Sequence, residues 1–179
     1  MPRLDRDLRK ALGNVRSPRR DNKERLNDKK WTRLNSRISP AWWGQETGVS
    51  DWLEVSQERV NTFADATGDH QWIHVDVARA TREIGGPIAH GYLTLSLIPF
   101  LSSGLMPVKG VTRGINYGSD KVRFTNMVRV GKRVRLRQKL IGAEPKSGGL
   151  QVKTLSTIEI EGEERPACVA ETISVLYDA

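Results

Sequence analysis

The sequence predicts an α+β fold in which a curled antiparallel sheet wraps around one central apolar helix. No Asp, Glu, Lys or Arg occurs between Ile84 and Val108, and the continuous apolar part of this stretch, 92–101, is typical of a helix buried on all sides. After Gly104, four segments alternate apolar and polar residues with the period of strands. Turn signals separate these segments, so we expect an antiparallel meander.

Local signals place the individual elements. A first strand is expected over 50–55, and Ser56 is the expected N-cap of a helix over 57–66 that Gly68 ends. Asp76 is the expected cap of a short helix that runs to Glu83. The four segments of the meander are 113–124, 133–143, 150–160 and 167–177.

Two prolines limit the apolar helix. Pro99 lacks a backbone N–H, so it predicts a kink. Pro87 and the neighbouring glycines shorten the uncharged stretch to the ten residues 92–101, whereas a membrane span needs about 20. We therefore expect a helix of the protein core and no membrane contact. His90 is expected to help fix the start of this helix.

Length and charge indicate one domain with a basic extension. The chain has 179 residues, which suits a single core. Residues 1–44 hold 13 Lys and Arg against 5 Asp and Glu, which leaves 16 of each in the rest of the chain (29 − 13 and 21 − 5). We predict a basic, flexible extension over 1–38 and one domain over 39–179. Binding of this extension to nucleic acid or an anionic membrane is the less favoured alternative.

Cysteine content and the N-terminus point to the cytoplasm. Cys168 is the one cysteine, so neither an intrachain disulfide nor a cysteine-ligated zinc site is expected, and we interpret it as a small apolar strand residue. No apolar segment follows Met1, so no secretory signal is expected.

The loop between the two predicted helices carries the candidate chemistry. Asp69 precedes His74 by five positions, and a carboxylate with an imidazole forms a general acid/base pair. The backbone N–H of Gly91, at the start of the apolar helix, suits the binding of a developing negative charge. Together these groups indicate an enzyme that makes or breaks a bond beside a carbonyl. A zinc site on His70, His74, Asp69 and His90 is the less favoured alternative.

Two motifs resemble those of a known family. Thr67-Gly-Asp-His-Gln-Trp-Ile-His74, followed by Ile88-Ala-His-Gly91, resembles the hydratase-2 motif of MaoC-like, (R)-specific enoyl-CoA hydratases, and is most similar to their nodulation protein N-like branch. The resemblance runs from about Val49 to the C-terminus and implies the hot-dog fold. This chain has Gln71-Trp72 where the motif usually has Asn-Pro, which affects the expected pocket shape.

The resemblance implies roles for particular residues. Asp69 and His74 would hold and activate water, and the Gly91 N–H would bind the thioester oxygen. The further substrate-binding residues that we predict are Thr94, Ser96, Asn116, Lys121 and Arg123, the last two for the phosphates of coenzyme A or a carrier-protein pantetheine. No metal and no separate cofactor are implied, because coenzyme A or pantetheine is part of the substrate.

The implied assembly is a homodimer whose two sheets join edge to edge. The implied activity is the reversible hydration of trans-2-enoyl thioesters in fatty-acid metabolism. Two alternatives stay open at this point. The same fold supports thioester hydrolysis, and it also supports a non-catalytic module that binds acyl thioesters or a partner.

Overall fold

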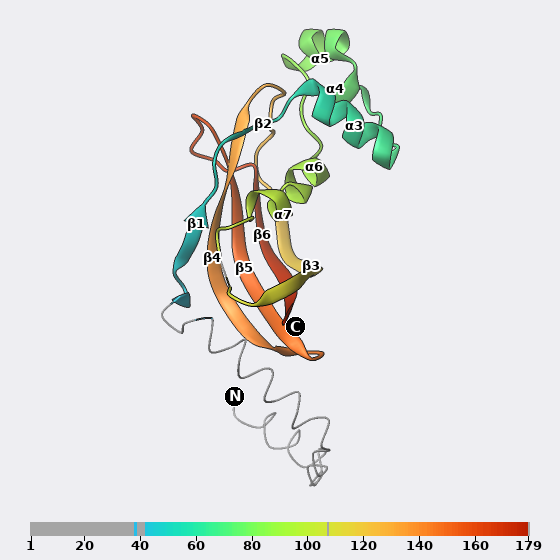
Figure 1. Cartoon of the computed structure of the whole chain (residues 1–179). Coiled ribbons are helices and arrows are strands. Elements are labelled where there is room, and N and C mark those ends of the chain that lie inside the picture. The colour runs from blue at the N-terminus through green and yellow to red at the C-terminus, as the bar shows by residue number, and fades with distance from the viewer. Residues whose placement is uncertain (1–37, 39–41, 107, 179) are drawn as a thin grey trace, which may run out of the picture.

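A single antiparallel sheet forms the body of the protein, as seen in a computed structural model that describes residues 38, 42–106 and 108–178 (Figure 1). The strand order is β1-β4-β5-β6-β3, and β2 also pairs with β4. The strands are β1 (Glu46–Val49), β2 (Leu53–Glu54), β3 (Val111–Phe124), β4 (Arg133–Lys146), β5 (Gly149–Ile160) and β6 (Cys168–Asp178). The predicted extension and its boundary lie outside the described residues, apart from Ile38.

Five helices occur among the described residues: α3 (Gln57–Thr67), α4 (Trp72–Val75), α5 (Val77–Ile84), α6 (Gly91–Ser96) and α7 (Ile98–Leu101). The first three gather at one end of the sheet, whereas α6 and α7 lie across its face (Figure 1). The predicted caps are confirmed. Ser56 Oγ accepts from Arg59 N at 3.2 Å, and Asp76 Oδ1 accepts from Arg79 N at 2.9 Å. Gly68 ends α3 with a φ of 78°, in the left-handed region.

The predicted meander is only partly correct. Strands β4, β5 and β6 are consecutive neighbours, as expected, but β3 pairs with β6 instead of β4. The connection 125–132 does not close a hairpin, because its backbone bonds to other segments. Thr125 N donates to Ala167 O at 2.9 Å, and Gly131 N donates to Val55 O at 2.8 Å. Gly131 does lie in a turn, as predicted. This turn belongs to a connection between β3 and β4, two strands that are not neighbours in the sheet.

The predicted first strand over 50–55 is wrong in its bounds. Pairing with β4 begins at Glu46, stops after Val49 and resumes at Leu53. The interruption has a local cause: Leu136 N donates to Ser50 Oγ at 2.9 Å, so a side chain takes the place of a backbone acceptor.

The apolar helix is divided and is not buried on all sides. It runs as α6 and α7 with a break at Leu97, two residues before Pro99, in agreement with the predicted kink. Leu93, Leu97 and Leu101 are buried, but Tyr92 is 69% and Phe100 67% exposed. The absence of charge therefore does not mean that the single chain covers this helix. One face of it is exposed in the single chain.

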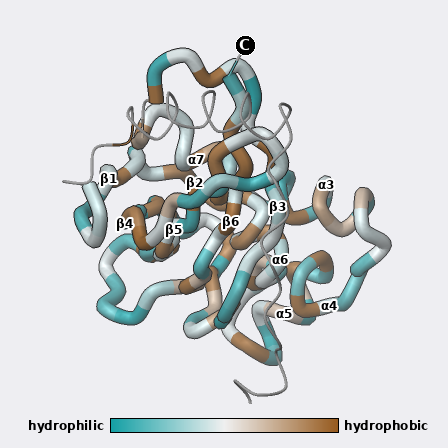
Figure 2. Tube along the Cα trace, turned by 90° about the horizontal axis from the view of Figure 1, so that it is seen from below, coloured by the Kyte–Doolittle hydropathy of each residue, from teal (hydrophilic) through white to brown (hydrophobic). Residues whose placement is uncertain are grey.

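Two apolar clusters form the core. The larger joins α6 and α7 to the near ends of β4, β5 and β6, and the smaller lies at the far end of the sheet around Leu140, Leu150 and Val152. Apolar segments of α7 and these strands gather in the middle of the molecule (Figure 2). Cys168 is fully buried in the larger cluster, and burial raises the pKa of its thiol to about 11. None of the described helices has the length and apolar character of a membrane span.

Candidate active site

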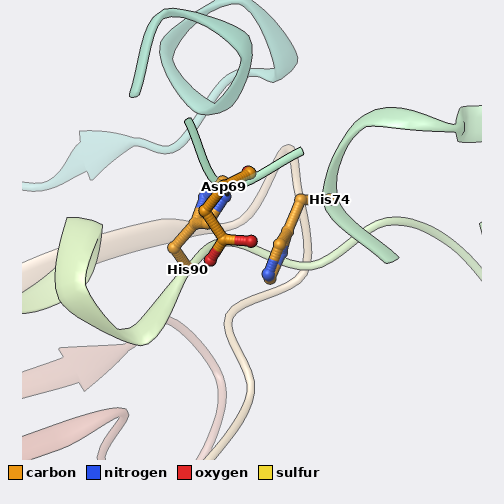
Figure 3. A group of neighbouring side chains, drawn as sticks. All are labelled: Asp69, His74 and His90. Atoms are coloured by element: carbon orange, nitrogen blue, oxygen red, sulfur yellow. Dashed lines mark hydrogen bonds between the residues drawn. The ribbon is translucent and has the colours of Figure 1, made fainter. Parts of the chain in front are cut away.

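Asp69, His74 and His90 converge at the N-terminal end of α6. One oxygen or nitrogen atom from each lies within 4.8 Å of the others. The left-handed Gly68 turns the chain after α3 to deliver Asp69, the single turn of α4 carries His74, and His90 directly precedes α6. The Asp69 carboxylate points toward the His74 ring (Figure 3). The structure thus places side by side the two residues predicted to form an acid/base pair.

Backbone contacts fix the tautomer and position of His74. The residue is 6% exposed, and its Nδ1–H donates to Ile88 O at 2.7 Å. This contact leaves Nε2 as the nitrogen with a free lone pair. Gln57 Nε2, from α3, donates to His74 O at 2.8 Å and so ties α4 to the neighbouring helix. The ring is held as a neutral imidazole with one basic nitrogen available.

The environment of His74 favours this neutral form. Burial is the main cause that lowers the pKa of its imidazole, and the neighbouring His90 lowers it further. The Ile88 carbonyl and the Asp69 carboxylate act in the opposite direction, but they do not outweigh burial. His74 can therefore accept a proton at neutral pH.

His90 supports both members of the pair. Its ring stacks on His74 with centroids 3.7 Å apart, and its Nε2–H donates to the backbone oxygen of Asp69 at 2.9 Å. As the residue before α6 it occupies the N-cap position, yet its side chain makes no capping hydrogen bond. We expected it to fix the helix start; instead its side chain holds the Asp69 loop against that start. Its Nδ1 is buried and without a partner among the described residues.

The geometry disfavours the zinc alternative. His70 is exposed and its Nε2 lies 3.7 Å from Asp65 Oδ1, outside the group of Asp69, His74 and His90, so the proposed four-residue ligand set is not assembled. The His74 and His90 rings are nearly parallel, with 28° between their planes. Because nitrogen lone pairs lie in the ring plane, two stacked imidazoles cannot both aim at one ion about 2 Å away.

Gly91 makes a close approach to the end of β3. A Cβ at this position would lie 2.9 Å from Phe124 Cγ, closer than real Cβ contacts come. Phe124 also makes an edge contact with Tyr92, with ring centroids 5.6 Å apart. Position 91 therefore requires glycine. In the single chain the neighbour that requires it is an aromatic side chain, and this packing sets the position of the Gly91 N–H.

We predict that Gly91→Ala lowers stability by about 1 to 3 kcal/mol, as overpacking typically does, because the Phe124 ring must move. Thermal or urea unfolding measures this change. Gly142→Ala is the matched control, since its added Cβ would lie an ordinary 3.5 Å from Lys153 Cβ. Adding Phe124→Leu to Gly91→Ala should restore part of the loss. Equal unfolding midpoints for the two alanine variants would contradict this explanation.

The other predicted substrate-binding residues fall into three groups. Ser96 and Asn116 line a cavity of about 360 Å³ between α6 and β3. Thr94 is buried, and its hydroxyl donates to His90 O at 3.3 Å, so the single chain does not present it to that cavity. Lys121 pairs with Glu171 at 2.7 Å, whereas Arg123 donates to its neighbour Val122 O and is exposed. Arg123 is thus the freer of the two cations.

Sequence reasoning did not find two features near this site. The first is the contact of Phe124 with Gly91, two residues that are 33 positions apart in the sequence and share no local pattern. The second is a set of polar residues on the inner face of the sheet, including Gln138 and Thr154, which line a larger cavity of about 510 Å³. These residues alternate regularly with outward-facing ones along β4 and β5, and this pattern in the sequence could have identified them as inward-facing.

Solved structures with the same fold include two R-hydratases. The unliganded R-hydratase PhaJ1 from Pseudomonas aeruginosa matches with a TM-score of 0.63 and 22% identity, over 76% of this chain and 83% of that one. The (R)-hydratase from A. caviae matches with a TM-score of 0.62 and 24% identity, over 75% and 96%. These likenesses establish the hot-dog fold, the fold class that we predicted.

Sequence comparisons then identify the family. A model of the MaoC-like domain matches residues 40–162. The 3-hydroxyacyl-thioester dehydratase Z of Mycobacterium tuberculosis is 53% identical over 132 residues, 73% of this chain and 87% of the relative. Nodulation protein N of Rhizobium leguminosarum bv. viciae is 45% identical over 141 residues, 76% and 88%. The protein is a hot-dog lyase of the hydratase or dehydratase class. The chain belongs to the MaoC-like domain family.

Proposed function

We propose that the protein is an (R)-specific enoyl-thioester hydratase of fatty-acid metabolism. It adds water reversibly to trans-2-enoyl thioesters of coenzyme A or of acyl-carrier pantetheine and forms (R)-3-hydroxyacyl thioesters. The convergence of Asp69 and His74 at the start of α6 is the observation that supports this function most strongly. The name of the 53% identical mycobacterial relative, a 3-hydroxyacyl-thioester dehydratase, points to the same substrate class.

The site residues can account for every proton in this reaction. His74 Nε2 and the Asp69 carboxylate hold a water molecule and accept one of its protons while its oxygen bonds to the β-carbon. The electron pair of the double bond moves toward the thioester, and the protonated Asp69–His74 pair returns the proton that it took from water to the α-carbon. In this proposal the Gly91 N–H stabilises the oxygen of the enolate, a donor of the kind worth roughly 3 kcal/mol in other enzymes.

Because no electrons are gained or lost, the proposed reaction needs no redox cofactor, and in this proposal Asp69 and His74 activate the water without a metal. Coenzyme A or pantetheine takes part as the handle of the substrate. Arg123, exposed at the end of β3 next to Phe124, is the residue that we propose for its phosphates. Lys121 would first have to give up its ion pair with Glu171.

A simple assay separates this proposal from its alternatives. With crotonyl-CoA, hydration lowers the absorbance of the conjugated enoyl thioester and releases no thiol. Hydrolysis releases free thiol, and a binding module without activity does neither. The proposal predicts the first result. Thiol release at a rate comparable to the loss of absorbance would favour a thioesterase instead.

We also propose a homodimer that is formed through β3 and the α6–α7 helix. Among the strands that the structure describes, β3 ends the sheet, so one edge of its backbone has no neighbouring strand within residues 42–106 and 108–178. Large apolar side chains are exposed along this side of the molecule: Tyr92, Phe100, Ile115, Tyr117 and Phe124. Several exposed apolar side chains next to an open sheet edge are typical of a subunit interface.

We predict that Phe100→Asp converts the dimer to a monomer at micromolar concentration. Two-fold symmetry places the new charge in the interface twice, and a buried aromatic contact can be worth 2 kcal/mol or more. Analytical ultracentrifugation measures the change. Val77→Asp on α5 is the control, because Val77 is 47% exposed but lies in a first helical turn, where acidic side chains are tolerated. A wild-type monomer, or equal association of both variants, would contradict the proposed interface.

A further inference from the structure

The inner face of the sheet carries a polar band between the two apolar clusters. Along β5 the inward residues are first apolar (Leu150, Val152), then polar (Thr154, Ser156), then apolar again (Ile158, Ile160). The registers of β4 and β6 bring further polar side chains to the same level, since Gln138 lies opposite Ser156 and Thr172 opposite Thr154. The band also includes Ser174 and, across from it on β3, Asn116.

Hydrogen bonds within the band leave some of its polar groups free. Thr172 Oγ1 lies 2.8 Å from Thr154 Oγ1 and 3.0 Å from Ser156 Oγ, and Gln138 Nε2 donates to Thr154 Oγ1 at 3.2 Å. Within the part of the chain that the structure describes, no donor reaches Gln138 Oε1, and the side chains of Ser174 and Asn116 make no hydrogen bond. Asn116 is exposed and Ser174 half-buried, so these free groups are open to the space beside the sheet and can bond to water or to a ligand there.

The free groups face a cavity. Gln138, Ser174 and Asn116 line the cavity of about 510 Å³ together with the bonded Thr172, and the other wall of this cavity is apolar and includes Ile98 and Met106. Asn116, Thr172, Ile98 and Pro99 also line the cavity of about 360 Å³ beside Ser96. The two cavities share these residues and therefore form one groove along α6 and α7, with an apolar side and a polar floor.

The groove starts near the proposed reaction centre. Its upper end includes Leu95 and Ser96, one helical turn after Gly91. At a rise of 1.5 Å per residue, Ile98 lies about 10 Å along the helix from Gly91. An acyl chain whose thioester oxygen binds at Gly91 could therefore extend down the groove and reach the polar band with its far part.

We propose that this groove selects acyl chains that carry a hydroxyl group at a distance from the thioester. The apolar wall suits the methylene part of such a chain. Gln138 Oε1 accepts a hydrogen bond from the hydroxyl, and Ser174 or Asn116 donates one to its oxygen. This inference rests on the proposed function, since it assigns the groove to the acyl chain of the same substrate.

Matched substrates test the inference. Each member of a length series of trans-2-enoyl-CoAs is prepared with a terminal methyl, a terminal hydroxyl and a terminal carbonyl, and kcat/KM is measured for all three. At one chain length the hydroxyl form should be preferred over the methyl form by about tenfold, the size of one buried hydrogen bond. Equal values at every length, or a preference for the carbonyl form, would overturn the inference while hydration itself stays intact.

Variants locate the selectivity. Gln138→Met should reduce the hydroxyl-to-methyl ratio to near one, and Ser174→Ala, which leaves no hydrogen-bond partner of Ser174 unpaired among the described residues, should reduce it several-fold. Thr157→Val, on the outer face of β5, is the control and should leave the ratio unchanged. Two results would overturn the inference: an equal change of the hydroxyl-to-methyl ratio in all three variants, or no change in any of them. Either result would mean that the polar band binds only water.

A binding measurement keeps the inference separate from the proposed function. Calorimetry with saturated acyl-CoAs that differ only in the terminal group needs no turnover. Tighter binding of the hydroxyl form, lost in Gln138→Met, would support the polar floor even if the protein hydrates nothing. Equal binding of both forms to the wild-type protein would reject the polar floor, whatever the assay of hydration shows.

Discussion

Replacement of Asp69 by Asn is expected to reduce the hydration of crotonyl-CoA by at least about 10²- to 10⁴-fold, the usual contribution of a positioned acid or base. The amide has almost the same shape as the carboxylate but cannot accept a proton from water. Asp69 is partly buried, and its Oδ1 accepts only a long hydrogen bond of 3.3 Å from Gln71 among the described residues. The fold should therefore tolerate the change, and kcat should fall more than KM rises.

Asp65→Asn is the matched control for this variant. Asp65 lies on the last turns of α3, is exposed, and pairs with His70 instead of the reaction centre. Its replacement should leave kcat/KM within about twofold, because exposed ion pairs contribute little. If Asp69→Asn retained most of the wild-type activity with an unchanged unfolding midpoint, the proposed role of the carboxylate would be wrong.

The second large effect concerns His74. We expect His74→Gln to lower kcat by a similar 10²- to 10⁴-fold, because the amide nitrogen that replaces the imidazole is not basic. In the wild-type protein, activity should fall as the pH falls, since protonation of Nε2 removes the proton acceptor. The pKa of His74 is lowered from 6.5, so the acid limb of the profile of kcat/KM should lie below pH 6.5. A limb above that pH would contradict the buried, neutral imidazole.

The same shift in pKa affects stability. The unfolded chain binds a proton at His74 more readily than the folded protein does, so unfolding takes up a proton between the folded and unfolded pKa values. The contribution of His74 is thus fully present above pH 6.5 and is lost as the pH falls below it. Urea unfolding of wild type and His74→Gln at pH 7 and pH 5 should show a larger decrease for the wild type.

Much of the fold could be predicted because its signals are local. Caps such as Ser56 and Asp76 depend on one or two neighbouring residues, and the alternation in β5 depends on its own pattern. The pairing of β3 with β6 could not be predicted in this way. It depends on backbone contacts of the connection after β3 with Val55 and Ala167, which are far away in the sequence.

The candidate site, like the fold, was predictable only where the signal is local in the sequence. The spacing of Asp69 and His74 predicted that the two would act together, and the structure brings them close to each other. The sequence did not show that His90 stacks on His74 or that Phe124 packs against Gly91, because these contacts arise only when α6 meets the sheet. The exposed face of α6 and α7 also differs from the prediction, since one apolar stretch does not show which of its residues the rest of the chain covers.

The central claim is that Asp69 and His74 direct a water molecule to the β-carbon of an enoyl thioester. Turnover of crotonyl-CoA in water that carries a heavy oxygen isotope, followed by mass spectrometry of the products, tests it directly. The account predicts that the label enters the β-hydroxyl group of an intact thioester in the wild-type protein, and that Asp69→Asn gives almost no labelled product. Label found in a free carboxylate, or equal labelling by both proteins, would contradict it.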